Sequence, residues 1–138
     1  MNSVFTLHPR LAADTAFIAD WPLSQILLMK DRRFPWLILV PRKAGLSELF
    51  DLDQEPLNRL TAEITDISKR LKAWAKADKI NVAALGNQVP QLHVHVIARK
   101  ISDAAWPNPP WSGGRPVPYE DGELARVTTE LKRLFAQS

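Results

Sequence analysis

Residues 90–99 read PQLHVHVIAR and place His93 and His95, two of the three histidines of the chain, one residue apart in an apolar run. Successive side chains of a β-strand point to opposite faces, so a strand here would present Gln91, His93 and His95 on one face. The apolar residues between them would face the core. The sequence therefore predicts a strand whose polar groups follow one another at roughly 6.5 to 7 Å, from the rise of ~3.3 Å per residue.

Three explanations of this polar row are compatible with the residue types. A solvent-facing side of an amphipathic strand requires no function. A metal site could use two strand histidines, but the chain has no cysteine and no acidic residue follows the strand before Asp103, so His8 would have to reach the site from far away. Phosphoryl transfer needs a neutral imidazole as nucleophile and a second group that holds a phosphate oxygen. The pattern favours this third explanation, with no metal and no cofactor required.

The segments before this strand predict a hairpin and a long helix. Residues 26–29 and 36–40 are apolar runs separated by a polar turn, and the unbroken second run indicates a strand covered on both faces. A helix is expected to begin after Asp53, with Pro56 in its first turn. Apolar residues recur at spacings of three and four from Leu57 to Trp74, as on a helix that packs across a sheet.

The remaining segments complete an α+β pattern. Residues 79–85 predict another core strand, residues 101–118 form a loop rich in Pro, Gly and Trp, and a last helix is expected from about Asp121. The segments 4–11 and 15–21 are expected to be extended or turn-like. We therefore predict one domain over residues 1–138, with a mainly antiparallel sheet of about five strands, a long helix packed on it and a C-terminal helix.

The composition is that of an ordinary globular protein. The chain has 138 residues, of which 46% are hydrophobic and 24% charged, and its net charge of +3 is scattered, so no nucleic-acid partner is expected. No apolar run approaches the ~20 residues that cross a bilayer, and no secretory signal opens the chain, so no membrane partner is expected. With the absence of cysteine, these features predict a cytoplasmic location.

The histidine strand resembles the signature of the histidine triad (HIT) superfamily of nucleotide hydrolases and transferases, His-φ-His-φ-His-φ-φ, in which φ is apolar. Residues 91–97 read QLHVHVI and match the second and third histidines and all four apolar positions, with glutamine at the first. The segments LILVPRK at 37–43 and LFDL at 49–52 are similar to the family's central strand and its entry into the long helix. Trp106-Pro107 is similar to the Trp-Pro that follows the triad strand in some members. The resemblance covers residues 23–111.

The resemblance implies a role for each residue of the motif. His93 corresponds to the nucleophile that attacks the α-phosphate and forms a nucleotidyl-histidine, which water then resolves. His95 corresponds to the histidine that donates to a phosphate oxygen. Asn87 and Gln88 occupy phosphate-contacting positions with amides, which can still donate hydrogen bonds. Gln91 stands at the first position of the triad, where it can orient a partner or a water but cannot titrate.

Three residues outside the motif are further candidates. Asp31 is either an acceptor for a ribose hydroxyl or a turn aspartate. Trp106 and Trp111 either cap the core or belong to a tail that, in some family members, reaches the pocket of the partner subunit.

The family implies a homodimeric enzyme that acts at the α-phosphate of a nucleotide or dinucleoside polyphosphate, as a hydrolase or a nucleotidyl transferase. The alternative is a nucleotide-binding or regulatory protein with weak turnover, which Gln91 would permit.

Overall fold

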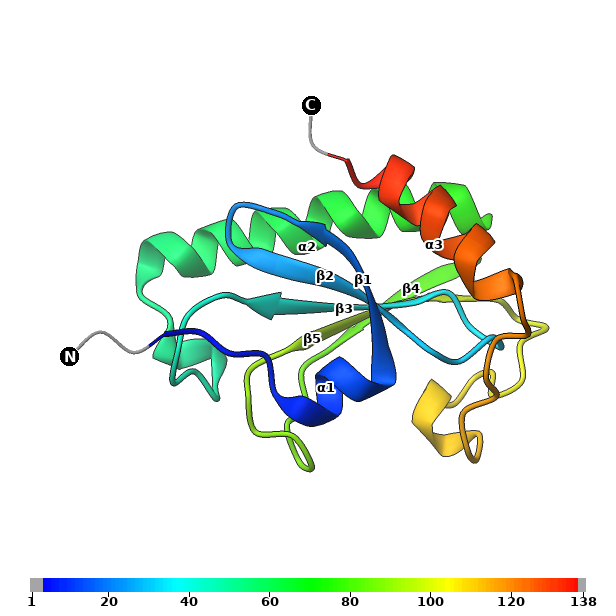
Figure 1. Cartoon of the computed structure of the whole chain (residues 1–138), viewed down its shortest axis with the longest axis horizontal. Helices are drawn as coiled ribbons and strands as arrows, with labels where there is room; N and C mark the ends of the chain where they lie inside the picture. The colour runs from blue at the N-terminus through cyan, green and yellow to red at the C-terminus, as the bar shows by residue number, and fades with distance from the viewer. Residues whose placement is uncertain (1–3, 137–138) are drawn as a thin grey trace.

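The computed structural model describes residues 4–136 as an antiparallel sheet with helices on both faces (Figure 1). Its elements, in chain order, are α1 (Pro9–Asp14), β1 (Thr15–Asp20), β2 (Ser24–Met29), β3 (Trp36–Pro41), the 3-10 turn η1 (Leu49–Asp51), α2 (Gln54–Ala75), β4 (Lys79–Ala83), β5 (Val94–Arg99), the 3-10 turn η2 (Pro110–Ser112) and α3 (Glu123–Leu134). The predicted α+β class with a five-stranded antiparallel sheet is confirmed.

The histidine strand β5 lies inside the sheet, in the strand order β1-β2-β3-β5-β4. The predicted hairpin is formed by β2 and β3, and every residue of β3 is buried, as its unbroken apolar run predicts. β3 pairs with β5 so that Ile38 lies opposite His95 and Leu39 opposite Val94. The hairpin thus supplies the floor beside the histidines.

Helices α2 and α3 cover one face of the sheet, on the upper side of Figure 1. Asp53 is the N-cap of α2, as expected, and the stripe of α2 buries Leu60, Ile67 and Leu71 in the core. The apolar residues that alternate with the histidines, Leu92, Val94 and Val96, belong to this core. The predicted alternation along β5 is therefore confirmed.

The opposite face of the sheet carries a second apolar cluster and the short helix α1. Leu11 of α1 packs there with Trp36 and Ile38 of β3 and Ile97 of β5. Because both faces are covered, β5 is buried along its whole length.

The segment before the first strand, and the fourth strand, differ from the prediction. Residues 9–14 form a helix, since Pro9 suits the first turn and the His8 ring accepts a hydrogen bond from the Arg10 N–H, and residues 15–20 form an edge strand. Residues 79–83 form a half-exposed edge strand, β4, and not a core strand, because β5 pairs with only one of its edges. Val82 is 50% exposed.

No helix within residues 4–136 combines the length and hydrophobicity that a membrane crossing would require.

Candidate active site

His93 directly precedes β5 and His95 is its second residue, and the two rings lie together with their centroids 5.0 Å apart. Their exposed fractions are only 7% and 8%. The row is therefore not the solvent-facing side of an amphipathic strand. Buried imidazoles need partners for their nitrogens, and each ring has one at Nδ1: an acceptor for His93 and a donor for His95.

Nδ1 of His93 lies 2.7 Å from the backbone carbonyl oxygen of Gln91. A carbonyl only accepts hydrogen bonds, so a neutral His93 carries its proton on Nδ1. The lone pair of the neutral ring is then on Nε2.

His95 has the opposite arrangement. Nδ1 of His95 lies 3.0 Å from the indole nitrogen of Trp36, which can only donate. The proton of a neutral His95 is therefore on Nε2, where it is available as a donor. Burial, with a smaller contribution from the charge of His93, lowers the pKa of His95 to about 4, so the ring stays neutral at physiological pH.

A cleft of about 410 Å³ opens over the two rings. Its wall combines apolar residues from α1, β2 and β3 with the loop that joins β4 to β5. Asn87 and Gln88 line the cleft from that loop, and Trp111 lines it from η2. The cleft is lined by Arg10, Leu11, Asp14, Met29, Trp36, Ile38, Leu85, Gly86, Asn87, Gln88, Val89, His93, His95 and Trp111. The size suits a small organic molecule with polar groups at one end.

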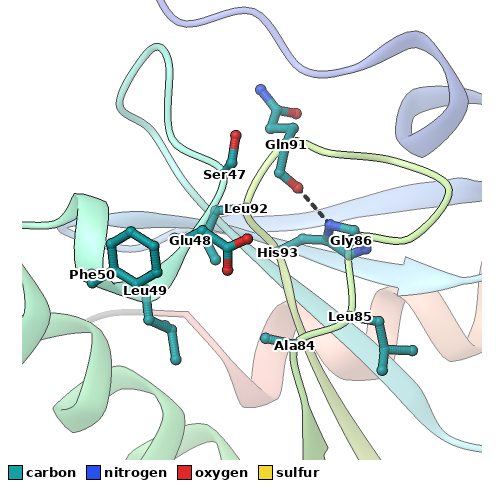
Figure 2. A pocket seen from close by; sticks show the side chains of 10 residues that line it. All are labelled: Ser47, Glu48, Leu49, Phe50, Ala84, Leu85, Gly86, Gln91, Leu92 and His93. Carbon is teal, nitrogen blue, oxygen red and sulfur yellow. Dashed lines mark hydrogen bonds between the residues drawn. The ribbon is translucent and has the colours of Figure 1, made fainter.

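A smaller hollow of about 220 Å³ lies on the other side of the loop and also borders His93 (Figure 2). Ser47, Glu48 and Phe50 line it from the segment before α2, and Leu85 and Gly86 separate it from the larger cleft. Gly86 has a φ of 75°, in the left-handed region that glycine adopts without strain. His93 is thus shared by two adjoining cavities.

The side chain of Gln91 is directed away from the histidine rings, as Figure 2 shows. Its oxygen accepts from the N–H of His8 at 2.8 Å, and its nitrogen donates to the carbonyl of Thr6 at 2.9 Å. Gln91 therefore contacts His93 through its backbone carbonyl, a contact that does not depend on the identity of its side chain.

Asp31 lies in neither cavity. Its carboxylate is fully buried and accepts hydrogen bonds from the N–H of Arg33, from the Arg33 guanidinium and from the N–H of Val117. Arg33 also donates to the carbonyl of Gly113 at 2.6 Å. Asp31 is therefore a turn aspartate that holds the loop after β5, and its full burial keeps it out of reach of a ribose bound in either cavity.

Trp106 also lies outside both cavities. It stacks on Arg99, whose guanidinium carbon is 5.7 Å from the ring centroid and which forms a buried ion pair with Asp103 at 2.7 Å. Burial alone would raise the pKa of Asp103, but hydrogen bonds from Arg99 and from backbone N–H groups lower it to about 2. Trp106 therefore packs on this ion pair, and Arg99 also donates to the carbonyl of Asn108, so the pair fixes the loop that carries Trp111.

Sequence reasoning missed two contributors to the site. Trp36 fixes the tautomer of neutral His95, and α1 supplies one wall of the cleft. Trp111, already a candidate from the sequence, covers the His95 ring at a centroid distance of 5.5 Å. Trp36 reaches His95 because of the register in which β3 pairs with β5. This register cannot be predicted from the residue pattern of either strand alone. The Pro9 after His8 was a usable signal for α1.

Within residues 4–136, no three or more His, Asp or Glu side chains come close enough together to hold a metal ion.

The HIT domain family model matches residues 10–101. Among solved structures, a histidine triad protein from Bradyrhizobium japonicum is 46% identical, with a TM-score of 0.92 over 97% of this chain and 100% of that chain. One from Marinobacter aquaeolei VT8 is 45% identical, with a TM-score of 0.92 over 96% of each chain. One from Sinorhizobium meliloti 1021 is 43% identical, with a TM-score of 0.90 over 95% of this chain and 97% of that chain.

A search of curated proteins finds no significant match. The family model covers most of the chain, and these three proteins share over 40% of its residues along nearly their whole lengths. On these grounds the chain belongs to the histidine triad family.

Proposed function

We propose that this protein is a nucleotide hydrolase or nucleotidyl transferase that acts at the α-phosphate of its substrate. The observation that carries the proposal is the pair of opposite partners at Nδ1: an acceptor for His93, which leaves the lone pair of the neutral ring on Nε2, and a donor for His95, which leaves its proton on Nε2. A nucleophile and a hydrogen-bond donor side by side are what attack on a phosphate ester requires.

In the first step, Nε2 of His93 attacks the α-phosphorus as the bond from phosphorus to the leaving group breaks. The electron pair of that bond departs with the leaving group, and the imidazolium keeps its Nδ1 proton on the carbonyl of Gln91. His95 donates from Nε2 to a phosphate oxygen, and the amides of Asn87 and Gln88 are candidates for the other oxygens. In the second step, water or another hydroxyl acceptor attacks phosphorus as the bond from phosphorus to Nε2 breaks. The electron pair of that bond returns to Nε2, which leaves His93 neutral, and the proton of the acceptor passes to solvent.

The two cavities suggest where each part of the substrate binds. The larger cleft, with its apolar wall, suits a nucleoside, and the smaller hollow on the other side of Gly86 suits the leaving group. His93 borders both, so a phosphorus atom between them would be within its reach. We propose this division because in-line displacement places nucleophile and leaving group on opposite sides of phosphorus.

We also propose a homodimer joined along the free edge of β4. The edge carries unpaired backbone groups, and Val82, Leu85 and Phe50 nearby are 50%, 48% and 82% exposed. Ala84 and Leu85 follow β4 directly and line the smaller hollow, so a second copy paired there would border it. Light scattering should give the mass of a dimer, and Val82→Lys should shift it toward the monomer.

The test of the chemistry is a substrate panel of dinucleoside polyphosphates, nucleoside phosphoramidates and nucleotide sugars. His93→Ala should lower turnover by at least about 10³-fold, the scale seen when a nucleophile is removed. Gln54→Ala, on the exposed start of α2, is the control. Unchanged turnover in His93→Ala rejects the mechanism, and tight nucleotide binding by the wild type without any product supports the alternative of a binding protein.

A further inference from the structure

The glutamine at the first position of the triad is fully occupied by contacts outside the histidine pair. Its side-chain oxygen and nitrogen both bond to the backbone of residues 6–8, which lie 83 and 85 positions away in the chain. The carbonyl of Thr6 and the N–H of His8 flank Leu7, and in an extended segment these two groups point to the same side. The amide of Gln91 thus pairs with this segment as a neighbouring strand would.

The choice of glutamine follows from this geometry. A primary amide carries a donor and an acceptor side by side on one carbon, so it can meet an N–H and a C=O of one extended segment together. The two nitrogens of an imidazole diverge around the ring. A histidine here could therefore satisfy one of the two backbone groups and would leave the other without this partner.

Residues 6–8, which the Gln91 amide contacts, lead directly into α1, which forms a wall of the larger cleft. His8 is the N-cap of α1, through its ring nitrogen and the N–H of Arg10 at 3.1 Å. α1 then contributes Arg10, Leu11 and Asp14 to the cleft lining. Because α1 has only six residues, it depends on such tertiary contacts for its position.

We propose that Gln91 is a positioning residue that couples the substrate-binding wall to the nucleophile. Its side chain fixes residues 6–8 and, through them, α1, while its carbonyl orients the ring of His93. The inference rests on the proposed function, since it assigns α1 to the nucleotide wall of the same site. Glutamine at the first position of the triad then serves to hold α1 in its place in the wall of the cleft.

The test compares Gln91→Met and Gln91→His with the wild type and with Gln54→Met, a matched exposed control. Hydrogen exchange of α1 should speed up in both Gln91 variants, that of the His8 amide should speed up in Gln91→Met, and both should stay unchanged in the control. With the best substrate of the panel, KM should rise about tenfold, because each variant loses about one net hydrogen bond that orders the wall of the cleft. The value of kcat should change by less than about threefold.

Each other outcome overturns the proposal in a recognisable way. Unchanged exchange at His8 and α1 shows that the hydrogen bonds of the Gln91 side chain do not order this segment. Faster exchange with an unchanged KM shows that they are structural only. A higher kcat in Gln91→His shows that the natural glutamine limits the chemistry. A wild type that neither binds nor turns over any nucleotide rejects the proposed function itself, and with it the coupling, whatever the exchange data show.

Discussion

Trp36 donates its indole N–H to Nδ1 of His95 across the β3–β5 pair, at 3.0 Å, and the two rings lie 5.7 Å apart. The contact leaves His95 one place for its proton, Nε2. The carbonyl of Gln91 imposes the reverse on His93. Two identical side chains at adjacent positions of one face are thereby given different chemistry, and both causes lie outside the histidines themselves.

Trp36→Phe should lower kcat by about tenfold or more, because phenylalanine keeps an aromatic ring in place but removes the donor that fixes His95. Loss of one preorganised donor in comparable sites costs ~10²–10³-fold, and here the donor is displaced for part of the time only. Steady-state kinetics measures the effect. Trp74→Phe, on α2, is the control, and a kcat equal to that of the wild type in Trp36→Phe would contradict the role of Trp36.

The stability of the fold should decline as the pH falls from about 6.5 toward 4. His95 has an ordinary pKa of 6.5 when unfolded and about 4 when folded, so in this window the unfolded state binds more protons. Protonation would also break the hydrogen bond from Trp36. The slope should be at most about 1.4 kcal/mol per pH unit in urea unfolding.

His95→Gln is the comparison for this pH dependence, because its amide oxygen can still accept from Trp36 but does not titrate. The variant should lose less stability than the wild type between pH 6.5 and 4. Parallel curves for the two proteins would show that His95 is not the group responsible.

Asp103→Asn should destabilise the fold by about 3 kcal/mol, since it leaves the guanidinium of Arg99 buried without its counter-charge. Asp66→Asn is the matched control, because Asp66 pairs with Arg70 on the exposed surface of α2 and such pairs contribute at most about 1 kcal/mol. Urea unfolding at neutral pH compares the two. Equal losses in the free energy of unfolding would mean that the buried Arg99–Asp103 pair stabilises the fold no more than the exposed Arg70–Asp66 pair.

Trp111→Ala should raise the pKa of His95, because the indole that covers the imidazole at 5.5 Å is replaced by a methyl group and water. NMR titration of the His95 ring measures the shift directly. We also expect a higher KM, since Trp111 lines the larger cleft. An unshifted His95 titration would show that the loop after β5 does not shield the site.

The sequence was sufficient for the parts of the fold that have a strong period of their own. Three patterns of apolar residues are confirmed: the unbroken run of β3, the stripe of α2 and the alternation along β5. Each pattern reflects how that element alone is buried. β4 was predicted as a core strand because its residues are apolar enough, but position at the edge of a sheet is decided by its neighbours.

The candidate site was predictable only as far as the strand and its preceding loop extend. His93, His95, Asn87 and Gln88 line one cleft, as their shared segment suggests. Asp31 is the opposite case: the sequence left it as either a ribose acceptor or a turn aspartate, and its carboxylate pairs with Arg33 in the turn. Contacts between residues 60 or 80 positions apart, such as those of Trp36 and Gln91, depend on register and could not be read from local patterns.

The most direct test of the account is the tautomeric state of the two rings, measured by long-range ¹H–¹⁵N correlation NMR on the free protein near pH 7. We predict that neutral His93 is protonated on Nδ1 with a bare Nε2, and that neutral His95 is protonated on Nε2 with a bare Nδ1. Two rings in the same tautomer, or a charged His95 at that pH, would contradict it.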